Sequence, residues 1–477
     1  MPLLCYACIK NDNTYLIWAP TPRLTIPMNT AAKQPTEVQP ISFWCATLFW
    51  LKLGFISFGG PAGQIAIMHQ ELVEKRHWIS ERRFLHALNF CMLLPGPEAQ
   101  QLATYIGWLM HRAWGGLVAG LLFILPSLFI LIILAWIYLV YGDVPMVAAV
   151  FYTIKPAVIA IVMYAAYRIG KRVLNNLIML SIALASFIAI FQFKLGFPLI
   201  ILSAALIGII GGRIMPTRFG VDEPHESSPE SFGKAIIDDH TDLPKHAKFR
   251  LAKFVTVILV GLVLWCLPMG LLNFSLGWEH SLTQMGWFFT KAALVTFGGA
   301  YAVLPYVYQG AVDNYAWTTP HQMIDGLALG ETTPGPLIMV VAFVGFMGGY
   351  QQMILSPDQL VLSGVVAACV VTWFTFLPSF VFIFAGGPFI ESTHNDINFT
   401  APLSAITAAV VGVIVNLGLF FSYHVLWPEG LTTEFDYLSA IITTIAAVAL
   451  VRFKCSVIVI IISSAIAGLV LTFLGWV

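Results

Sequence analysis

Long apolar runs follow one another along almost the whole chain, and short polar stretches separate them. A helix needs about 20 residues to cross a hydrocarbon core roughly 30 Å thick, and such windows recur throughout the sequence. The pattern therefore predicts an all-α polytopic membrane protein. The thirteen apolar segments lie near residues 42–66, 85–110, 114–141, 145–167, 174–192, 197–212, 252–273, 282–308, 325–350, 360–385, 401–426, 437–451 and 456–476.

The third and tenth segments, 114–141 and 360–385, are longer than one crossing needs, and each contains a proline. Proline removes a backbone donor and bends a helix. A kink, a tilt or a split into two short helices therefore stays open for both segments.

Composition supports the membrane assignment. Of the 477 residues, 58% are hydrophobic and only 10% are charged, and the mean hydropathy of +0.84 lies outside the range of soluble domains. The formal net charge is zero, which argues against a nucleic-acid partner. The seven cysteines form no disulfide framework, and the one Cys-x-x-Cys pair, Cys5 and Cys8, has no helix or strand pattern around it that would favour a redox or metal role. The sequence holds no nucleotide, protease or hydrolase motif and no Cys/His cluster with metal spacing, so we expect neither an enzyme nor a cofactor nor a metal site.

Polar stretches divide the chain. Residues 1–40 form a polar tail, and Met28 stands just before the first apolar run, so residues 1–27 are either a mis-assigned start or a disordered tail. The expected units are the tail at 1–40, a first repeat at 41–212, a polar cytoplasmic connector at 213–250, a linking transmembrane segment at 251–280 and a second, inverted repeat at 281–477.

Basic residues in short loops set the expected orientation. A cytoplasmic N-terminus places Arg112, the basic cluster at 168–172 and Arg452 on the cytoplasmic side, whereas the loop at 70–84 disagrees. Its glutamates nearly balance its basic residues, so we expect the N-terminus inside.

An internal repeat organises the chain. Shifting the sequence by 239 residues aligns KLGFISFGG with KAALVTFGG and Trp78 with Trp317 without a gap. Eleven of the 46 positions from Lys52 to Pro97 are identical under this shift, and they include a Pro-Gly-Pro tripeptide in each half. The tripeptide LPS recurs as well, at 125–127 and 377–379. Each tryptophan follows a polar turn and resembles an anchor at the membrane interface.

Seven apolar segments separate the starts of the two copies. Because this number is odd, the second copy enters the membrane from the opposite side, and we expect inverted halves. Inverted repeats with interrupted helices at matching positions are typical of secondary transporters, which bind substrate near the bilayer midplane between the repeats.

The motif FGGP should break the first apolar segment at Gly59, Gly60 and Pro61. Freed backbone groups are costly in hydrocarbon, so such a break is tolerated where it lines a cavity. The helix that follows points free N–H groups and a partial positive charge at an anion. The alternative is close helix packing through Gly59 and Gly63, four residues apart. The corresponding Gly-Gly pair of the second half favours a functional break.

The Pro-Gly-Pro tripeptides cannot continue a helix smoothly, because two donors are missing and a flexible residue lies between them. An ordinary kink or loop end is the alternative, but the same offset from both Gly-Gly pairs favours two pseudo-symmetric broken elements that face one site. These elements are Pro95, Gly96, Pro97 and Pro334, Gly335, Pro336.

Lys52 and Lys291 are repeat-equivalent and lie inside apolar segments, where a charge is costly and usually faces a polar pathway. Each lysine could bind an anion or pair with a carboxylate. Glu98 and Glu331 flank the Pro-Gly-Pro tripeptides and could pair with a lysine or take up a proton in coupled transport. Gln64 could donate to an oxyanion, although hydrogen bonding between helices is the usual role of such a side chain.

Four stretches closely resemble the chromate ion transporter family in its long form with two homologous halves. The similarity spans roughly residues 42–476, and its paired motifs are specific. The resemblance implies a transporter of the bacterial inner membrane that exports chromate and confers chromate resistance, with sulfate as a structural mimic. The stretches are FGGPAGQIAIMHQELVEKRHWIS, LLPGPEAQQLATYIGW, TFGGAYAVLPYV and ETTPGPLIMVVAFVGF.

Chromate and sulfate are tetrahedral dianions, which suit a site of half-helix N-termini and one or two lysines. One rival is sulfate or another oxyanion as the main substrate. A rival from another class is a membrane-embedded chromate-handling enzyme. The lipid bilayer is the expected surrounding, and a homodimer stays open. The expected substrate-binding residues are Lys52, Gly59, Gly60, Pro61, Gln64, Pro95, Gly96, Pro97, Lys291, Gly298, Gly299, Pro334, Gly335 and Pro336.

Overall fold

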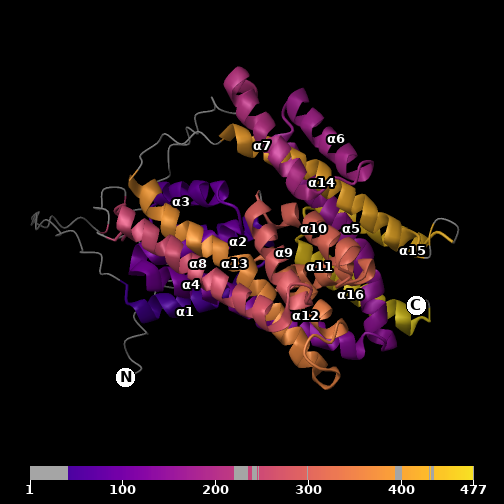
Figure 1. Ribbon diagram of the computed structural model, residues 1–477. Helices are drawn as coiled ribbons and strands as arrows, with labels where there is room; N and C mark the ends of the chain where they lie inside the picture. Colours follow the sequence, from indigo (N-terminus) through magenta and orange to yellow (C-terminus); the bar gives the residue numbers. More distant parts are fainter. Residues whose placement is uncertain are drawn as a thin grey trace, which may run out of the picture.

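The fold is built of helices (Figure 1). A computed structural model describes residues 41–219, 235–238, 244, 246–297, 299–392, 400–428, 430 and 434–475. The elements are α1 (Phe43–Ile56), α2 (Gly60–His69), η2 (Gln70–Lys75), α3 (Glu81–Leu93), α4 (Glu98–Tyr141), α5 (Pro145–Val173), α6 (Leu177–Phe191), α7 (Phe197–Ile214), η3 (Pro216–Phe219), α8 (Leu251–Leu276), α9 (Ser281–Val295), α10 (Ala300–Tyr308), η4 (Gln309–Asn314), α11 (Pro320–Thr332), η5 (Leu337–Met339), α12 (Val340–Gln351), η6 (Pro357–Gln359), α13 (Leu360–Ser392), α14 (Thr400–Leu426), α15 (Tyr437–Val451) and α16 (Val457–Phe473).

Six helices of the described chain are long and apolar enough to cross a membrane, namely α4, α5, α7, α8, α13 and α14. Shorter apolar helices, α1, α6, α12, α15 and α16, accompany them. Apart from one isolated β-bridge, the described residues contain no strand pairing. The prediction of an all-α polytopic membrane protein is therefore confirmed.

The long third and tenth segments are not split, because Pro126 lies inside α4 and Pro378 lies inside α13. α4 departs from helical geometry at His111 and Arg112, which lie in the gap predicted between the second and third segments. The predicted boundary there is thus a kink between two helices rather than a longer loop.

Helices of each half pack against helices of the other half. α5 of the first half packs against α15 and α16 of the second, and α14 of the second half packs against α6 and α7 of the first. Figure 1 shows α14 beside α6 and α7. α4 and α13 also pack together, and the main hydrophobic core draws on both halves. Residues of both halves therefore form the main hydrophobic core.

Trp78 and Trp317 are core residues, so their expected role as interfacial anchors is wrong. Trp317 is fully buried and Trp78 is 5% exposed. Their backbone N–H groups donate to the carbonyls of Leu72 and Ala311, each at 2.7 Å, which closes the turn after a π-helical stretch in both halves. The polar turn before each tryptophan folds back over the ring, and the sequence does not show this.

Part of the polar connector contacts the first half. Ile237 forms a parallel bridge with Ile79, and the His246 imidazole hydrogen bonds to the Trp108 carbonyl at 2.9 Å. Burial lowers the pKa of His246, which favours the neutral ring in this position. α8, which follows the connector, is mostly exposed, as a peripheral lipid-facing span would be.

Candidate functional site

Both Gly-Gly motifs interrupt a helix at the predicted place. Residues 57–59 separate α1 from α2, and residues 296–299 separate α9 from α10. The repeat-equivalent Gly60 and Gly299 have φ angles of +69° and +96°, where a side chain would be strained. The predicted breaks are confirmed, although Gly298 itself lies outside the described residues.

Both Pro-Gly-Pro tripeptides also lie at helix breaks. The first separates α3 from α4, and the second separates α11 from η5. Pro97 directly precedes the first residue of α4, and Pro336 directly precedes η5. Proline is well suited to these positions, because the first N–H groups of a helix have no partner within the helix.

Hydrogen bonds cross between the halves at these breaks. The Gly96 N–H donates to the Thr296 carbonyl at 2.8 Å, and the Gly335 N–H donates to the Ser57 carbonyl at 2.8 Å. The 239-residue shift relates Ser57 to Thr296 and Gly96 to Gly335. Each Pro-Gly-Pro turn therefore satisfies a carbonyl that the helix break of the other half sets free.

The serine of each LPS tripeptide lies against one of these turns. A Cβ added to Gly335 would lie 2.9 Å from Ser127 Cβ, and a Cβ added to Gly96 would lie 2.3 Å from Ser379 Oγ. All three repeated motifs thus converge on two equivalent places. The first junction is Ser57, Ser127 and Gly335, and the second junction is Thr296, Ser379 and Gly96.

The N-terminal ends of α2 and α10 are neighbours. A Cβ added to Gly299 would lie 3.8 Å from Pro61 Cγ. Helix N-termini carry unpaired N–H groups and partial positive charge. Close by, the buried hydroxyls of Ser57 and Ser127 have no hydrogen-bond partner within the described residues. This arrangement offers several donors to an oxyanion.

Gly63 supports the break rather than packing between helices. A Cβ at this position would lie 2.8 Å from the carbonyl oxygen of Phe58, which belongs to the same break. A Cβ on Gly59 would meet only the Gly63 Cα, at 3.8 Å. The Gly59 and Gly63 pair therefore shapes the turn, and the helix-packing alternative is wrong.

The glutamines act within the protein. The Gln64 amide donates to the Gly335 carbonyl at 2.5 Å, which ties α2 to the first junction. The Gln101 amide donates to the Pro95 carbonyl at 2.8 Å and contacts Ser379 Oγ at 3.4 Å in the second junction. Both amides therefore link a helix to a junction.

Glu98 and Glu331 are buried near the junctions, at the start of α4 and the end of α11. The hydroxyl of Tyr301, in the first turn of α10, donates a short hydrogen bond to Glu331. The charge of Arg168 acts on Glu331, and the charge of Arg172 acts on Glu98, both from the exposed end of α5. Cationic side chains of α5 are thus within electrostatic reach of both buried carboxyls.

The two predicted lysines do not join these groups. Lys52 lies on the exposed face of α1, beside the exposed Leu51. The Lys291 ammonium lies 5.7 Å from the centre of the Trp287 ring. No ion pair within the described residues links either lysine to a carboxylate, so the structure does not support the alternative in which these lysines pair with glutamates.

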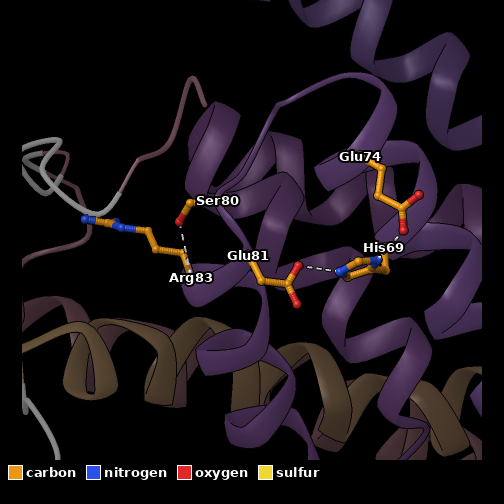
Figure 2. A network of polar contacts seen from close by, with 5 residues as sticks. All are labelled: His69, Glu74, Ser80, Glu81 and Arg83. Atoms are coloured by element: carbon orange, nitrogen blue, oxygen red, sulfur yellow. Dashed lines mark hydrogen bonds and ion pairs between the residues drawn. The ribbon is translucent and has the colours of Figure 1, made fainter. Parts of the chain in front are cut away.

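A polar network fixes the loop after α2 (Figure 2). His69 contacts Glu74 at 3.0 Å and forms a short contact with Glu81, the first residue of α3. In the same loop, burial raises the pKa of Glu71, but the hydrogen bonds and charges of Lys75 and Arg76 together outweigh it, so the pKa lies below its ordinary value. Figure 2 shows His69 of α2 between Glu74 of the loop and Glu81 of α3, so its contacts connect the two helices.

Sequence reasoning missed several residues near the site. The serines of the LPS tripeptides were visible as a repeated motif, which could have marked them. The basic cluster at the end of α5 was used only to set orientation, and nothing in the sequence links it to the breaks. The missed residues are Ser57, Ser127, Ser379, Thr296, Tyr301, Arg168 and Arg172.

Known proteins are similar in sequence to both halves of this chain. A family profile described as "Chromate transporter" matches residues 44–209 and 283–469. The chain is 30% identical to the chromate transport protein of Pseudomonas aeruginosa over 389 residues, which are 80% of this chain and 82% of the relative. It is 28% identical to the chromate transport protein of Cupriavidus metallidurans over 393 residues, 82% of this chain and 85% of the relative.

A probable chromate transport protein of Synechococcus elongatus is 28% identical over 370 residues, 78% of this chain and 82% of the relative. No solved structure matches the chain. The profile covers both halves, including every break described above, and the relatives align along most of their length. The chain therefore belongs to the chromate transporter family.

Proposed function

We propose that this protein exports chromate across the bacterial inner membrane and binds it between the N-terminal ends of α2 and α10. The observation that carries this proposal is the reciprocal pairing of helix breaks and Pro-Gly-Pro turns, which brings two helix N-termini together. Two relatives are named chromate transport proteins and a third is named a probable chromate transport protein, which supports chromate as the substrate.

The chemistry of the region suits a tetrahedral dianion. Backbone N–H groups and the Ser57 and Ser127 hydroxyls can donate to several oxygen atoms at once. Arg168 and Arg172 lie where their positive charge can attract an anion toward the site. A cation site would instead need converging oxygen ligands, and no cluster of metal-binding side chains exists among the described residues.

Export needs no nucleotide. An inside-negative potential favours outward movement of a dianion by about 4.6 kcal/mol per 100 mV, because each charge contributes about 2.3 kcal/mol. With the N-terminus in the cytoplasm, the basic cluster of α5 faces the cytoplasm, from which chromate is exported. Cells that contain the protein should therefore resist chromate.

Glu98 and Glu331 are proposed to tune the site. A carboxylate beside a helix N-terminus competes with an anion for the same positive charge. Proton uptake by either carboxyl would remove that competition, so proton coupling is compatible with the arrangement, although the voltage alone is sufficient.

Flux measurements in sealed liposomes test the function. The purified full-length protein is reconstituted, a membrane potential is imposed without a pH gradient, and labelled chromate is followed. Flux that increases with voltage supports the proposal. If chromate moves only when a proton gradient is present, a proton carrier is required, and no flux under either condition refutes chromate transport.

Sulfate is the second candidate substrate, because it has the same shape and charge as chromate. Competition with sulfate, molybdate and phosphate in the same liposomes separates the candidates. Chromate as the preferred substrate predicts that excess sulfate inhibits weakly. Stronger inhibition by sulfate than by unlabelled chromate would make sulfate the main substrate.

A further inference from the structure

A second polar cluster lies away from the two junctions. Lys155 of α5 forms an ion pair with Asp325 of α11, with 3.4 Å between Lys155 Nζ and Asp325 Oδ2. The hydroxyl of Tyr138, near the end of α4, donates to the same carboxylate oxygen at 2.9 Å. The ring of His321, one turn earlier on α11, lies 6.3 Å from the ring of His424 on α14. The cluster thus joins four helices of both halves.

Lys155 is deep in its helix. It is the eleventh residue of α5, about 15 Å from the helix start at 1.5 Å per residue. A charged pair at this depth is costly to desolvate and is weak evidence of a stabilising role. Ionisable side chains at membrane depth usually face a transport pathway.

The two partners differ in their surroundings. The Lys155 side chain is 24% exposed, whereas the Asp325 side chain is 2% exposed. Asp325 Oδ1 is buried and has no hydrogen-bond partner within the described residues. The Lys155 side chain is therefore partly accessible, whereas the Asp325 carboxylate is buried. The 3.4 Å separation is within ion-pair distance but longer than the about 2.7–2.9 Å of a charge-assisted hydrogen bond.

Two helices of the cluster, α11 and α5, also carry charged residues of the candidate site. Asp325 precedes Glu331 on α11 by about 9 Å along the helix axis. α5 carries Lys155 in its first half and Arg168 and Arg172 near its C-terminal end. Lys155 forms an ion pair with Asp325, whereas the charges of Arg168 and Arg172 act on Glu331 and Glu98. α5 thus carries positive charge at two levels along its length.

We propose that Lys155 is a second oxyanion-binding residue on the transport pathway, and that Asp325 and Tyr138 hold it in place when no anion is bound. This inference rests on the proposed function. A tetrahedral dianion that moves along α5 exchanges with Asp325 for the Lys155 ammonium. Lys155 binds the anion as a point charge with three donors, which requires no fixed bidentate geometry.

Charge neutralisation in pairs tests this assignment. Full-length wild type, Lys155→Gln, Asp325→Asn and the double variant Lys155→Gln/Asp325→Asn are reconstituted in liposomes, and chromate flux is measured per molecule in the membrane. Chromate binding to each purified protein is measured by calorimetry. The double variant is decisive, because it leaves no unpaired charge in the cluster. We expect it to lose at least tenfold in flux and in affinity, whereas Asp325→Asn keeps flux and binds chromate more tightly.

A matched control replaces Lys75 and Glu71 by glutamines; this ion pair of 2.8 Å, with side chains 53% and 14% exposed, lies outside both junctions, and the variant should behave as the wild type. Wild-type flux or affinity in the double variant would show that Lys155 and Asp325 only neutralise each other's charge, and it would overturn the assignment of Lys155. Failure of the double variant to reach the membrane would identify the pair as a structural link and overturn it as well. A wild type that neither binds nor transports chromate would refute the proposed function and this inference together.

Discussion

The two junctions have the same geometry but different hydrogen bonding. In each, a Pro-Gly-Pro N–H donates to a carbonyl of the other half's break at 2.8 Å, and a serine lies against the glycine. In the second junction, the Thr296 hydroxyl donates to the Ala292 carbonyl at 2.6 Å and Ser379 receives the Gln101 amide. In the first junction, the Ser57 and Ser127 hydroxyls have no partner within the described residues.

The difference separates a structural role from a binding role. Repeated backbone contacts are what two related halves need to pack around a common axis. Unpaired buried hydroxyls are costly unless they serve a ligand or a moving part. The second junction is therefore interpreted as the structural member of the pair, and the first as the member that donates to the oxyanion.

Substituting the junction glycines should have the largest effect. Gly335→Ala places a Cβ 2.9 Å from Ser127 Cβ and 3.3 Å from the Phe123 carbonyl, at a φ of +103°. Neither neighbour can move easily, and the left-handed backbone adds about 1–3 kcal/mol of strain. We expect flux to fall to background. Gly96→Ala has similar backbone strain, at a φ of +127°, but its Cβ meets the ends of flexible side chains, Ser379 Oγ and Gln101 Nε2, so it should keep part of the flux.

The control for these variants is Gly270→Ala on α8, where a Cβ would meet no atom within 4 Å. It should transport as the wild type in the same liposome assay, with flux normalised to protein in the membrane. Equal loss in Gly335→Ala and Gly96→Ala would remove the distinction between rigid and adaptable junctions.

Removing the junction hydroxyls should have the next largest effect. Ser57→Ala and Ser127→Ala each delete a proposed donor to the oxyanion, and a hydrogen bond to a charged group contributes about 1.5–3 kcal/mol. We expect the KM for chromate to rise about tenfold or more in each, since 1.4 kcal/mol corresponds to about tenfold. The repeat-equivalent Thr296→Val and Ser379→Ala should change it less than about twofold. If all four variants respond alike, the two junctions do not differ in function.

Local chemistry explains which parts of this architecture could be predicted. Glycine pairs and Pro-Gly-Pro turns break helices wherever they occur, so the four interruptions could be located from the sequence. The 239-residue shift showed that they come in pairs. Neither signal states which break meets which turn. That pairing depends on the exchange of helices between the halves, which has no local sequence signature.

Single charged side chains were harder to place. The sequence shows that Lys52 is at membrane depth but not which side of α1 it occupies, because α1 is apolar on all sides. Asp325 and Lys155 are 170 positions apart, and only the fold brings them within 3.4 Å. The proximity of Arg168 to Glu331 likewise depends on how α5 passes α10 and α11.

The charges of α5 should have a moderate effect that depends on salt. Arg168 acts on Glu331 and Arg172 acts on Glu98, so Arg168→Gln and Arg172→Gln test the two halves separately. Attraction of an anion by exposed charges is screened within about 10 Å at 0.1 M salt and about 3 Å at 1 M salt. We expect a fewfold loss of flux at low salt that disappears at high salt, with Lys171→Gln as the control. A loss that persists at high salt would indicate direct binding instead of steering.

The smallest effect is expected from the two lysines that the sequence pattern placed in the site. Lys52 is exposed on α1, and Lys291 lies over the Trp287 ring, on the helix face that also contacts α8 through Thr290 and Trp265. Neither contacts a junction residue, so Lys52→Ala and Lys291→Ala should each change flux less than about twofold, and loss of the cation–π contact should cost about 0.5–1 kcal/mol. Abolished flux at normal membrane abundance in either variant would return that lysine to the pathway. It would also extend the first junction beyond the hydroxyls of Ser57 and Ser127, because a full positive charge would then dominate anion binding there.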